Sequence, residues 1–151
     1  MAEREPLAGE QGGTGDVIRE IRIAAPPGAV FEFFTDPQKM TRWKGRSAEL
    51  EPTPGGVYRV DIDGHVTSGE FLEVDAPRRV VFTWGWEEGG PVAPGSSTVE
   101  VELTPDGDGT LLRLTHRGLP EEEKEIHGIG WDRFLPRLGA VAAGEDPDAG
   151  S

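Results

Sequence analysis

The sequence predicts an α+β domain in which a curved antiparallel sheet of six to seven strands wraps around a long C-terminal helix, with two short helices after the first strand. Two observations predict this fold class. Between residues 47 and 117, short runs of alternating apolar and polar residues are separated by turn signals, as in an antiparallel meander. After residue 119, apolar residues recur with the period of an amphipathic helix.

The length and the two ends of the chain indicate one folded unit. A chain of 151 residues can bury the core of a single domain. Residues 1–15 and 144–151 are poor in bulky apolar residues, so we expect two disordered tails around a domain at residues 16–143. The N-terminus lacks the apolar segment of a signal peptide and the chain has no Cys, which together predict a cytoplasmic protein.

The first elements are a strand and two short helices. Residues 16–24 alternate Ile and Val with charged residues, which favours an extended strand. Pro26 and Pro27 suit the start of a first helix. Asp36, followed by Pro at the first helical position, then supplies the N-cap of a second short helix over residues 37–43.

The meander follows in six runs. The dipeptide Asp63-Gly64 is the sharpest hairpin signal between them. Within the runs, Glu70, Glu100 and Glu102 alternate with apolar neighbours and are expected to face solvent. The runs span residues 47–51, 56–62, 65–75, 78–86, 97–105 and 109–118.

The last helix is predicted from about residue 120 to residue 143. Three Glu in its first turn interact favourably with the positive end of the helix dipole. At about 100° per residue, His127 falls on the inward stripe of this helix. The apolar members of that stripe are Trp131, Phe134, Leu138, Val141 and Ala142.

The same helix contains residues that disturb helical geometry. Gly128 and Gly130 each cost about 0.5–1 kcal/mol relative to Ala, and Pro136 removes a backbone hydrogen bond. We therefore expect the helix to bend, to approach the sheet closely at the two Gly residues, and to stand away from it near Pro136. The space left between a bent helix and a curved sheet is a candidate cavity.

Charge and composition exclude several classes of partner and chemistry. The net charge of −13 would repel phosphate backbones and anionic lipid, so we expect neither nucleic acid nor a membrane as partner. Three His without Cys give no metal-ligand spacing, so we expect no metal. No Ser lies in a Gly-x-Ser-x-Gly context, and no Gly-rich segment has the Lys and helix of a phosphate loop. We expect no cofactor.

Four stretches resemble one family. Residues 25–43, 54–86, 97–120 and 127–138 are similar to the START-like, Bet v 1-like (SRPBCC) superfamily, and within it to the subfamily named after the activator of Hsp90 ATPase. The resemblance implies the helix-grip fold and a deep, mostly apolar pocket between the sheet and the last helix. The chain departs from the family pattern at Lys44, where an aromatic residue often follows Trp43, and at Pro136.

His116 and His127 are the candidate polar groups of that pocket. His116 ends the last strand on the same face as Leu112 and Leu114, and His127 lies on the inward stripe of the helix. Either imidazole could donate a hydrogen bond or move a proton on a bound carbonyl or enol, and either could instead tie the strand end to the helix. Both roles remain open for both residues.

Aromatic residues complete the expected ligand cavity. Planar apolar ligands suit aromatic walls, although the same side chains also suit a packed core. The expected cavity residues are Phe33, Trp43, Tyr58, Trp84, Trp86, His116, His127, Trp131, Phe134 and Leu138.

Three functions are compatible with these features of the sequence. The first is binding of a small hydrophobic molecule by a monomer or a homodimer. The second is an enzyme of the cyclase, dehydratase or hydrolase kind that acts on an apolar carbonyl substrate, with His127 or His116 as general acid or base. The third, co-chaperone action on Hsp90, is implied only by the resemblance.

Overall fold

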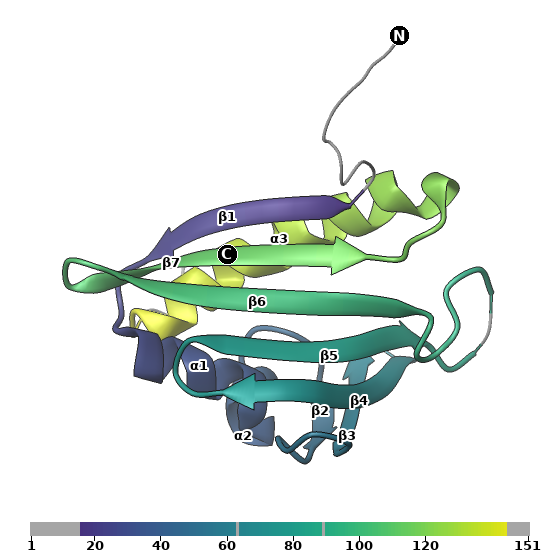
Figure 1. Cartoon of the computed structure of the whole chain (residues 1–151), viewed down its shortest axis with the longest axis horizontal. Coiled ribbons are helices and arrows are strands. Elements are labelled where there is room, and N and C mark those ends of the chain that lie inside the picture. The colour runs from purple at the N-terminus through teal and green to yellow at the C-terminus, as the bar shows by residue number, and fades with distance from the viewer. Residues whose placement is uncertain (1–15, 63, 89, 145–151) are drawn as a thin grey trace, which may run out of the picture.

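The fold is a seven-stranded antiparallel sheet that curves around one long helix (Figure 1). The computed structural model describes residues 16–62, 64–88 and 90–144. Except for Gly144, the tails predicted at residues 1–15 and 144–151 lie outside these ranges, as does Asp63 of the predicted hairpin. Within the described residues, the predicted α+β helix-grip architecture is confirmed.

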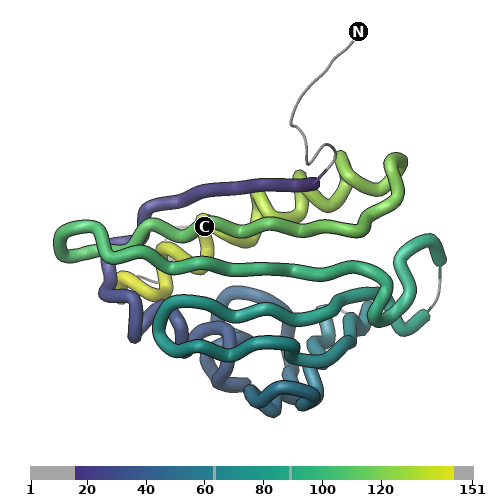
Figure 2. The backbone as a smooth tube through the Cα atoms, in the orientation of Figure 1, coloured from purple at the N-terminus to yellow at the C-terminus, as the bar shows by residue number. Residues whose placement is uncertain are grey.

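The strands follow the sequence patterns closely. Their order in the sheet is β1-β7-β6-β5-β4-β3-β2, and every neighbouring pair is antiparallel. Consecutive strands from β2 to β7 therefore form a continuous meander, and β1 joins it at β7 (Figure 2). The bounds are Val17–Ile23 (β1), Ser47–Leu50 (β2), Val57–Ile62 (β3), His65–Asp75 (β4), Arg79–Trp86 (β5), Ser97–Asp106 (β6) and Gly109–Arg117 (β7).

The helices also lie where proline and capping residues predict them. α1 spans Pro27–Thr35 with Pro at its start, and α2 spans Pro37–Met40. The side chain of Asp36 accepts a hydrogen bond from the backbone N–H of Gln38 at 2.9 Å, as expected of an N-cap. α2 is shorter than predicted, because residues 41–43 form a turn.

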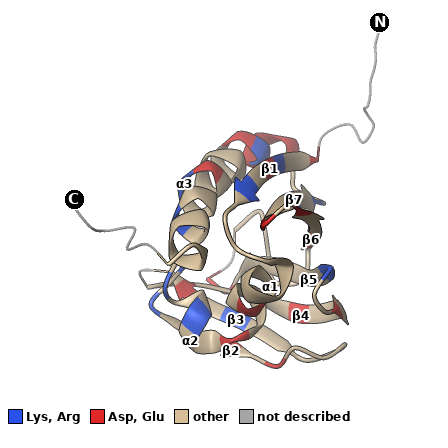
Figure 3. Cartoon of the chain, turned by 90° about the vertical axis from the view of Figure 1, so that its left-hand side faces the viewer, with Lys and Arg blue, Asp and Glu red and all other residues tan. Residues whose placement is uncertain are grey.

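The C-terminal helical segment has two parts. A 3-10 turn, η1, spans Glu121–Glu123, and α3 continues from Lys124 to Ala142 through Pro136. Seen along the sheet, α3 lies across the open side of the curve that runs from β1 to β2 (Figure 3). The pair Arg19–Asp132, 2.7 Å between Nε and Oδ1, links β1 to α3.

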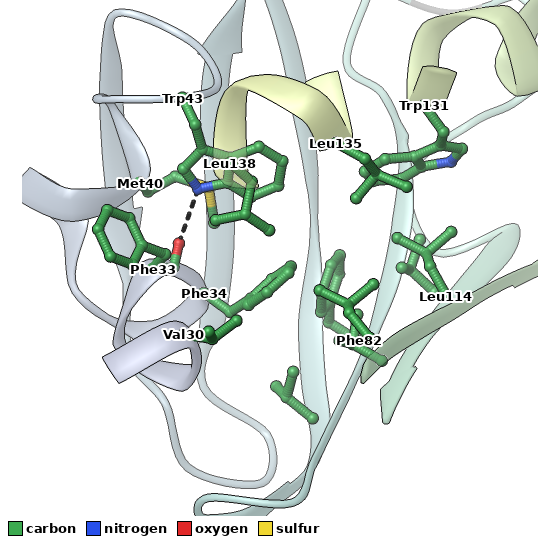
Figure 4. Packing of buried hydrophobic residues seen from close by; sticks show 14 of the residues in the cluster. Val30, Phe33, Phe34, Met40, Trp43, Phe82, Leu114, Trp131, Leu135 and Leu138 are labelled. Carbon is green, nitrogen blue, oxygen red and sulfur yellow. Dashed lines mark hydrogen bonds between the residues drawn. The ribbon is translucent and has the colours of Figure 1, made fainter. Parts of the chain in front are cut away.

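The core lies between the sheet, α1 and the C-terminal half of α3. Leu135 and Leu138 point from α3 toward Phe34, and Trp43 closes the same cluster (Figure 4). The indole Nε1 of Trp43 donates to the backbone oxygen of Phe33 at 3.0 Å, so its one polar atom is satisfied inside the core. Leu135 was missing from the predicted inward stripe, while Phe134 is only partly buried.

One expectation about the outer face of the sheet is wrong. Glu70 and Glu102 are exposed as predicted, but Glu100 is only 8% exposed. Its carboxylate accepts hydrogen bonds from Arg79 and Arg117 on the neighbouring strands. Burial by itself would raise the pKa of Glu100. The two guanidinium groups lower it by a larger amount, so the pKa lies below its ordinary value. The alternation of apolar and charged residues placed Glu100 on the outer face of the sheet. It could not reveal that two arginines cover the carboxylate there.

Candidate functional site

Two adjoining pockets lie where the N-terminal and middle parts of α3 face the ends of β3 and β5 and the turn after α2. The first, here called the apolar pocket, has a volume of about 270 Å³. The second, here called the polar pocket, has a volume of about 410 Å³ and adds Thr41, His65, Arg133 and Arg137. Both are lined by Lys44, Ile62, Trp86 and Phe134, so they meet along a shared wall.

The walls of the apolar pocket are indoles. Trp84 and Trp86 stand two residues apart on β5 and therefore point to the same side of the sheet, with ring centroids 5.0 Å apart at an interplanar angle of 74°. Trp131 faces them from α3. The other lining residues, apart from Lys44, are Ile62, Glu123, Ile126, His127, Gly130 and Phe134. This surface suits a flat apolar molecule.

His116 holds one of these walls in place. Nε1 of Trp131 donates to Nδ1 of His116 at 3.1 Å. Nε2 of His116 then carries the proton and donates to the hydroxyl of Ser97 at 2.9 Å, and this hydroxyl donates to the backbone oxygen of Trp84 at 2.7 Å. Burial, together with the nearby His127 and Lys44, lowers the pKa of His116 to about 3. His116 is therefore a neutral residue with both nitrogens bonded, which favours the structural role.

His127 differs from His116 because one of its nitrogens is unused. Nδ1 donates to the backbone oxygen of Glu123, one helical turn earlier, at 2.8 Å. Nε2 is then a bare acceptor, buried and without a hydrogen-bond partner among the described residues. Nε1 of Trp84 is likewise a buried donor without a partner in these residues, and the centroids of the two rings lie 5.2 Å apart. Two residues of the pocket wall thus carry one unused acceptor and one unused donor, both buried.

Lys44 is the site residue that the sequence did not identify as functional. It is 3% exposed, and its Nζ lies 4.4 Å from the ring centroid of Trp131 and 5.8 Å from that of Trp84. Its Nζ donates to the hydroxyl of Tyr58 at 3.5 Å, and within the described residues it forms no ion pair. Burial lowers the pKa of Lys44 to about 7. The only sequence signal was a departure from the family pattern, because periodicity cannot orient a side chain in a turn.

The expected cavity residues divide into two groups. Those that line at least one pocket are Trp43, Trp84, Trp86, His127, Trp131 and Phe134. The remaining four are buried in the core and line neither pocket, namely Phe33, Tyr58, His116 and Leu138.

The position of the cavity along α3 also differs in part from the expectation. A Cβ on Gly128 would lie 2.5 Å from the guanidinium of Arg19, so the helix does approach β1 closely at that residue. Gly130 has open space around it and lines the apolar pocket. Beyond Pro136, Leu138 is fully buried, so the helix packs on the core where it was expected to stand away.

Two further classes of site are absent from residues 16–62, 64–88 and 90–144. In these ranges, no helix combines the length and the apolar character needed to cross a membrane. They also contain no cluster of three or more His, Asp or Glu side chains that could hold a metal ion.

Comparison with known proteins adds a family. A family model described as "Activator of Hsp90 ATPase homolog 1-like protein" matches residues 24–143. No curated protein matches the chain.

Solved structures of similar proteins share the fold. An AHSA1-like protein from Rhizobium etli is 49% identical, with a TM-score of 0.70 over 88% of this chain and 84% of that chain. CalU16 from Micromonospora echinospora is 31% identical, with a TM-score of 0.70 over 85% of this chain and 76% of that chain. An HSP90 activator from Plasmodium falciparum is 27% identical, with a TM-score of 0.70 over 83% of this chain and 94% of that chain.

Proposed function

We propose that this chain, which belongs to the family of activator of Hsp90 ATPase homolog 1-like proteins, binds a small, flat, largely apolar molecule that carries a hydroxyl group. The observation that carries the proposal is a pair of buried polar atoms without hydrogen-bond partners among the described residues, Nε2 of His127 and Nε1 of Trp84, both of which belong to residues that line the apolar pocket. An unpaired buried polar group costs about 1–3 kcal/mol, and a ligand that pairs with it recovers that cost. A hydroxyl is both donor and acceptor, so its chemistry matches both atoms.

The pocket also limits the size of the ligand. Its volume of about 270 Å³ lies just below the usual range for small-molecule sites, which begins at about 300 Å³. Indole rings on two sides favour a flat ring system over a long flexible chain. A fused bicyclic hydrocarbon with one hydroxyl group is therefore the class of ligand proposed.

The direct test compares three ligands that differ in one group. Indane supplies only the ring system, and indanylmethanol adds a hydroxyl. Because three of the four Trp line the apolar pocket, quenching of Trp fluorescence reports binding. We expect indanylmethanol to bind about 5–30 times more tightly than indane, which is the scale of one or two neutral hydrogen bonds. The third ligand, the methyl ether of indanylmethanol, cannot donate to His127 and should lose part of this advantage.

Variants identify the atoms responsible. His127→Leu should keep the fold and weaken indanylmethanol binding by about 1–2 kcal/mol, while leaving indane binding nearly unchanged. His65→Gln is the matched control, because His65 is exposed, lines the polar pocket and pairs with Glu88 at 3.0 Å. Equal affinities for indane and indanylmethanol in the wild type would refute the proposed polar anchor.

Enzymatic action on an apolar carbonyl compound remains an alternative that the same pocket can support. Of the two candidate histidines, His116 has both nitrogens bonded within the protein, whereas Nε2 of His127 has no partner among the described residues. Between these two histidines, an acid or base role would then fall to His127. Turnover of an apolar enol or carbonyl substrate that is lost in His127→Leu, but kept in His65→Gln, would favour this alternative.

Activation of Hsp90 is a third candidate function. It is supported by the family match and by the likeness to the HSP90 activator from Plasmodium falciparum. The test is the ATPase rate of Hsp90 with and without the full chain. Stimulation that persists in His127→Leu would place this activity on a surface other than the apolar pocket.

A further inference from the structure

Lys44 occupies a position that the other lysines of the chain do not share. The sequence contains three lysines, Lys39, Lys44 and Lys124. Lys39 pairs with Glu32 and Lys124 pairs with Glu121, as surface lysines commonly do. Lys44 is buried, faces both pockets and has no carboxylate partner among the described residues.

The surroundings of Lys44 favour the neutral amine. Indoles approach its Nζ from three elements of the chain, with Trp131 nearest at 4.4 Å from the ring centroid. Among the titratable groups around it, Tyr58 lies 3.5 Å from Nζ and has a pKa raised by burial, and burial also keeps His116 neutral. His127, Glu123, Arg133 and Arg137 line the same pockets, but among the described residues no ion pair joins Lys44 to Glu123. Because no carboxylate stabilises the charge, burial lowers the pKa of Lys44 to about 7. A large fraction of the amine is then unprotonated near neutral pH.

We propose that Lys44 forms a reversible imine with apolar aldehydes that enter the apolar pocket, an inference that rests on the proposed ligand-binding function. The lone pair on Nζ attacks the carbonyl carbon, a C–N bond forms as the C=O π bond breaks, and one proton moves from Nζ to the oxygen to give a carbinolamine. The hydroxyl takes a second proton, the C–O bond breaks and water leaves, and Nζ loses its remaining proton to give the C=N bond. One amine and one aldehyde thus give one imine and one water, with no oxidant or reductant.

The pocket favours formation of the imine and also slows its hydrolysis. Desolvation in an apolar pocket is a known way to activate a lysine amine as a nucleophile. Tyr58 keeps its proton because burial raises its pKa, so its hydroxyl, 3.5 Å from Nζ, places no negative charge beside the amine that would stabilise the ammonium form. The indole walls limit access of water, which slows hydrolysis of the product.

The test is reductive trapping of the full chain at pH 7. The probe is indane carbaldehyde with sodium cyanoborohydride, which converts an imine to a stable secondary amine. Intact mass gives the number of adducts, and peptide mapping assigns them among the three lysines and the N-terminal amine. At this pH the unprotonated fraction of Lys44 exceeds that of an exposed lysine by roughly a thousandfold. We expect Lys44 to be labelled at least about tenfold faster than Lys39 or Lys124, because lower basicity offsets part of the gain.

Two controls separate this inference from the function on which it rests. Lys44→Met should form no adduct at that position, whereas Lys39→Met, at a lysine outside both pockets, should still be labelled at Lys44 as fast as the wild type. In the wild type, labelling in urea should lose its preference for Lys44, because the preference depends on the folded pocket. The imine proposal alone would be overturned if the three lysines of the folded wild type were labelled at equal rates. The same holds if no adduct formed although indanylmethanol binds. Failure of both ligands to bind would overturn the proposed function and the imine together.

Discussion

Nε1 of Trp131 donates a hydrogen bond to Nδ1 of His116 at 3.1 Å, whereas Nε1 of Trp84, a residue of the same pocket wall, has no partner among the described residues. The two indoles are similarly buried, at 4% and 3% exposure. One indole is therefore held in place through its ring nitrogen, and the other has a buried donor that the described residues leave unused.

This difference predicts unequal effects of the same substitution. Trp131→Phe removes a hydrogen bond and leaves Nδ1 of His116 unpaired, while Trp84→Phe removes a donor that has no partner. We expect Trp131→Phe to lower the free energy of unfolding by about 1–3 kcal/mol more than Trp84→Phe does. Urea denaturation of both variants measures this difference. Equal losses would show that the hydrogen bond contributes nothing to stability.

Filling the apolar pocket from the helix should separate binding from stability. Gly130→Leu places a side chain into open space that lines the pocket, so we expect loss of indanylmethanol binding in a folded protein. Replacing Gly within a helix also stabilises it by about 0.5–1 kcal/mol. Gly28→Ala in α1 is the matched control, because Gly28 also has open space but lies outside both pockets. Retained binding in Gly130→Leu would place the ligand elsewhere.

The buried amine of Lys44 predicts a rise in stability with pH. Its pKa is about 7 in the folded state and about 10.5 when exposed, so between these values the unfolded chain binds more protons. The free energy of unfolding should therefore increase with pH above about 7, by at most about 1.4 kcal/mol per pH unit. Measurements from pH 7 to about pH 9 avoid the ionisation of Tyr58 in the unfolded chain, where an exposed Tyr titrates near pH 10. His116 stays neutral throughout, because its pKa is about 3.

Lys44→Met should remove that rise. Urea denaturation should find the variant more stable than the wild type at pH 7, with the gap closing as the pH increases. Lys39→Met, at a solvent-accessible lysine paired with Glu32, should run parallel to the wild type. A Lys44→Met curve parallel to the wild type would mean that the amine keeps its ordinary pKa.

The carboxylate of Glu100 should matter for stability, unlike that of Glu70. Glu100 accepts hydrogen bonds from Arg79 and Arg117, whereas Glu70 is exposed. We expect Glu100→Gln to lower the free energy of unfolding by about 1–3 kcal/mol, and Glu70→Gln to change it by less than about 0.5 kcal/mol. Thermal or urea unfolding of the two variants checks this. If both variants match the wild type, the two guanidinium groups are sufficiently solvated without the carboxylate.

Patterns that repeat along the chain were enough to predict the sheet and the helices. Alternation located the described strands to within one or two residues, and Pro and Asp36 located the starts of α1 and α2. Contacts made by single side chains across the fold were not predictable. Lys44 lies in a turn without periodicity, and the burial of Glu100 depends on arginines from two other strands. Leu135 lies at the edge of the helical stripe, where an angle of 100° per residue does not separate buried from half-buried positions.

The pairing of β1 with β7 has a consequence for the order in which the chain folds. Each strand from β3 to β7 pairs with the strand that precedes it in sequence, so each of these hairpins can close as soon as its second strand has left the ribosome. β1 is synthesised first, yet Val17 pairs with His116, almost at the end of the domain. Closing so long a loop is entropically costly and slow, so the first strand is the last to join the sheet. Until then, the edge of β7 and the site for α3 are exposed, which makes the nearly finished nascent chain the form most prone to aggregate.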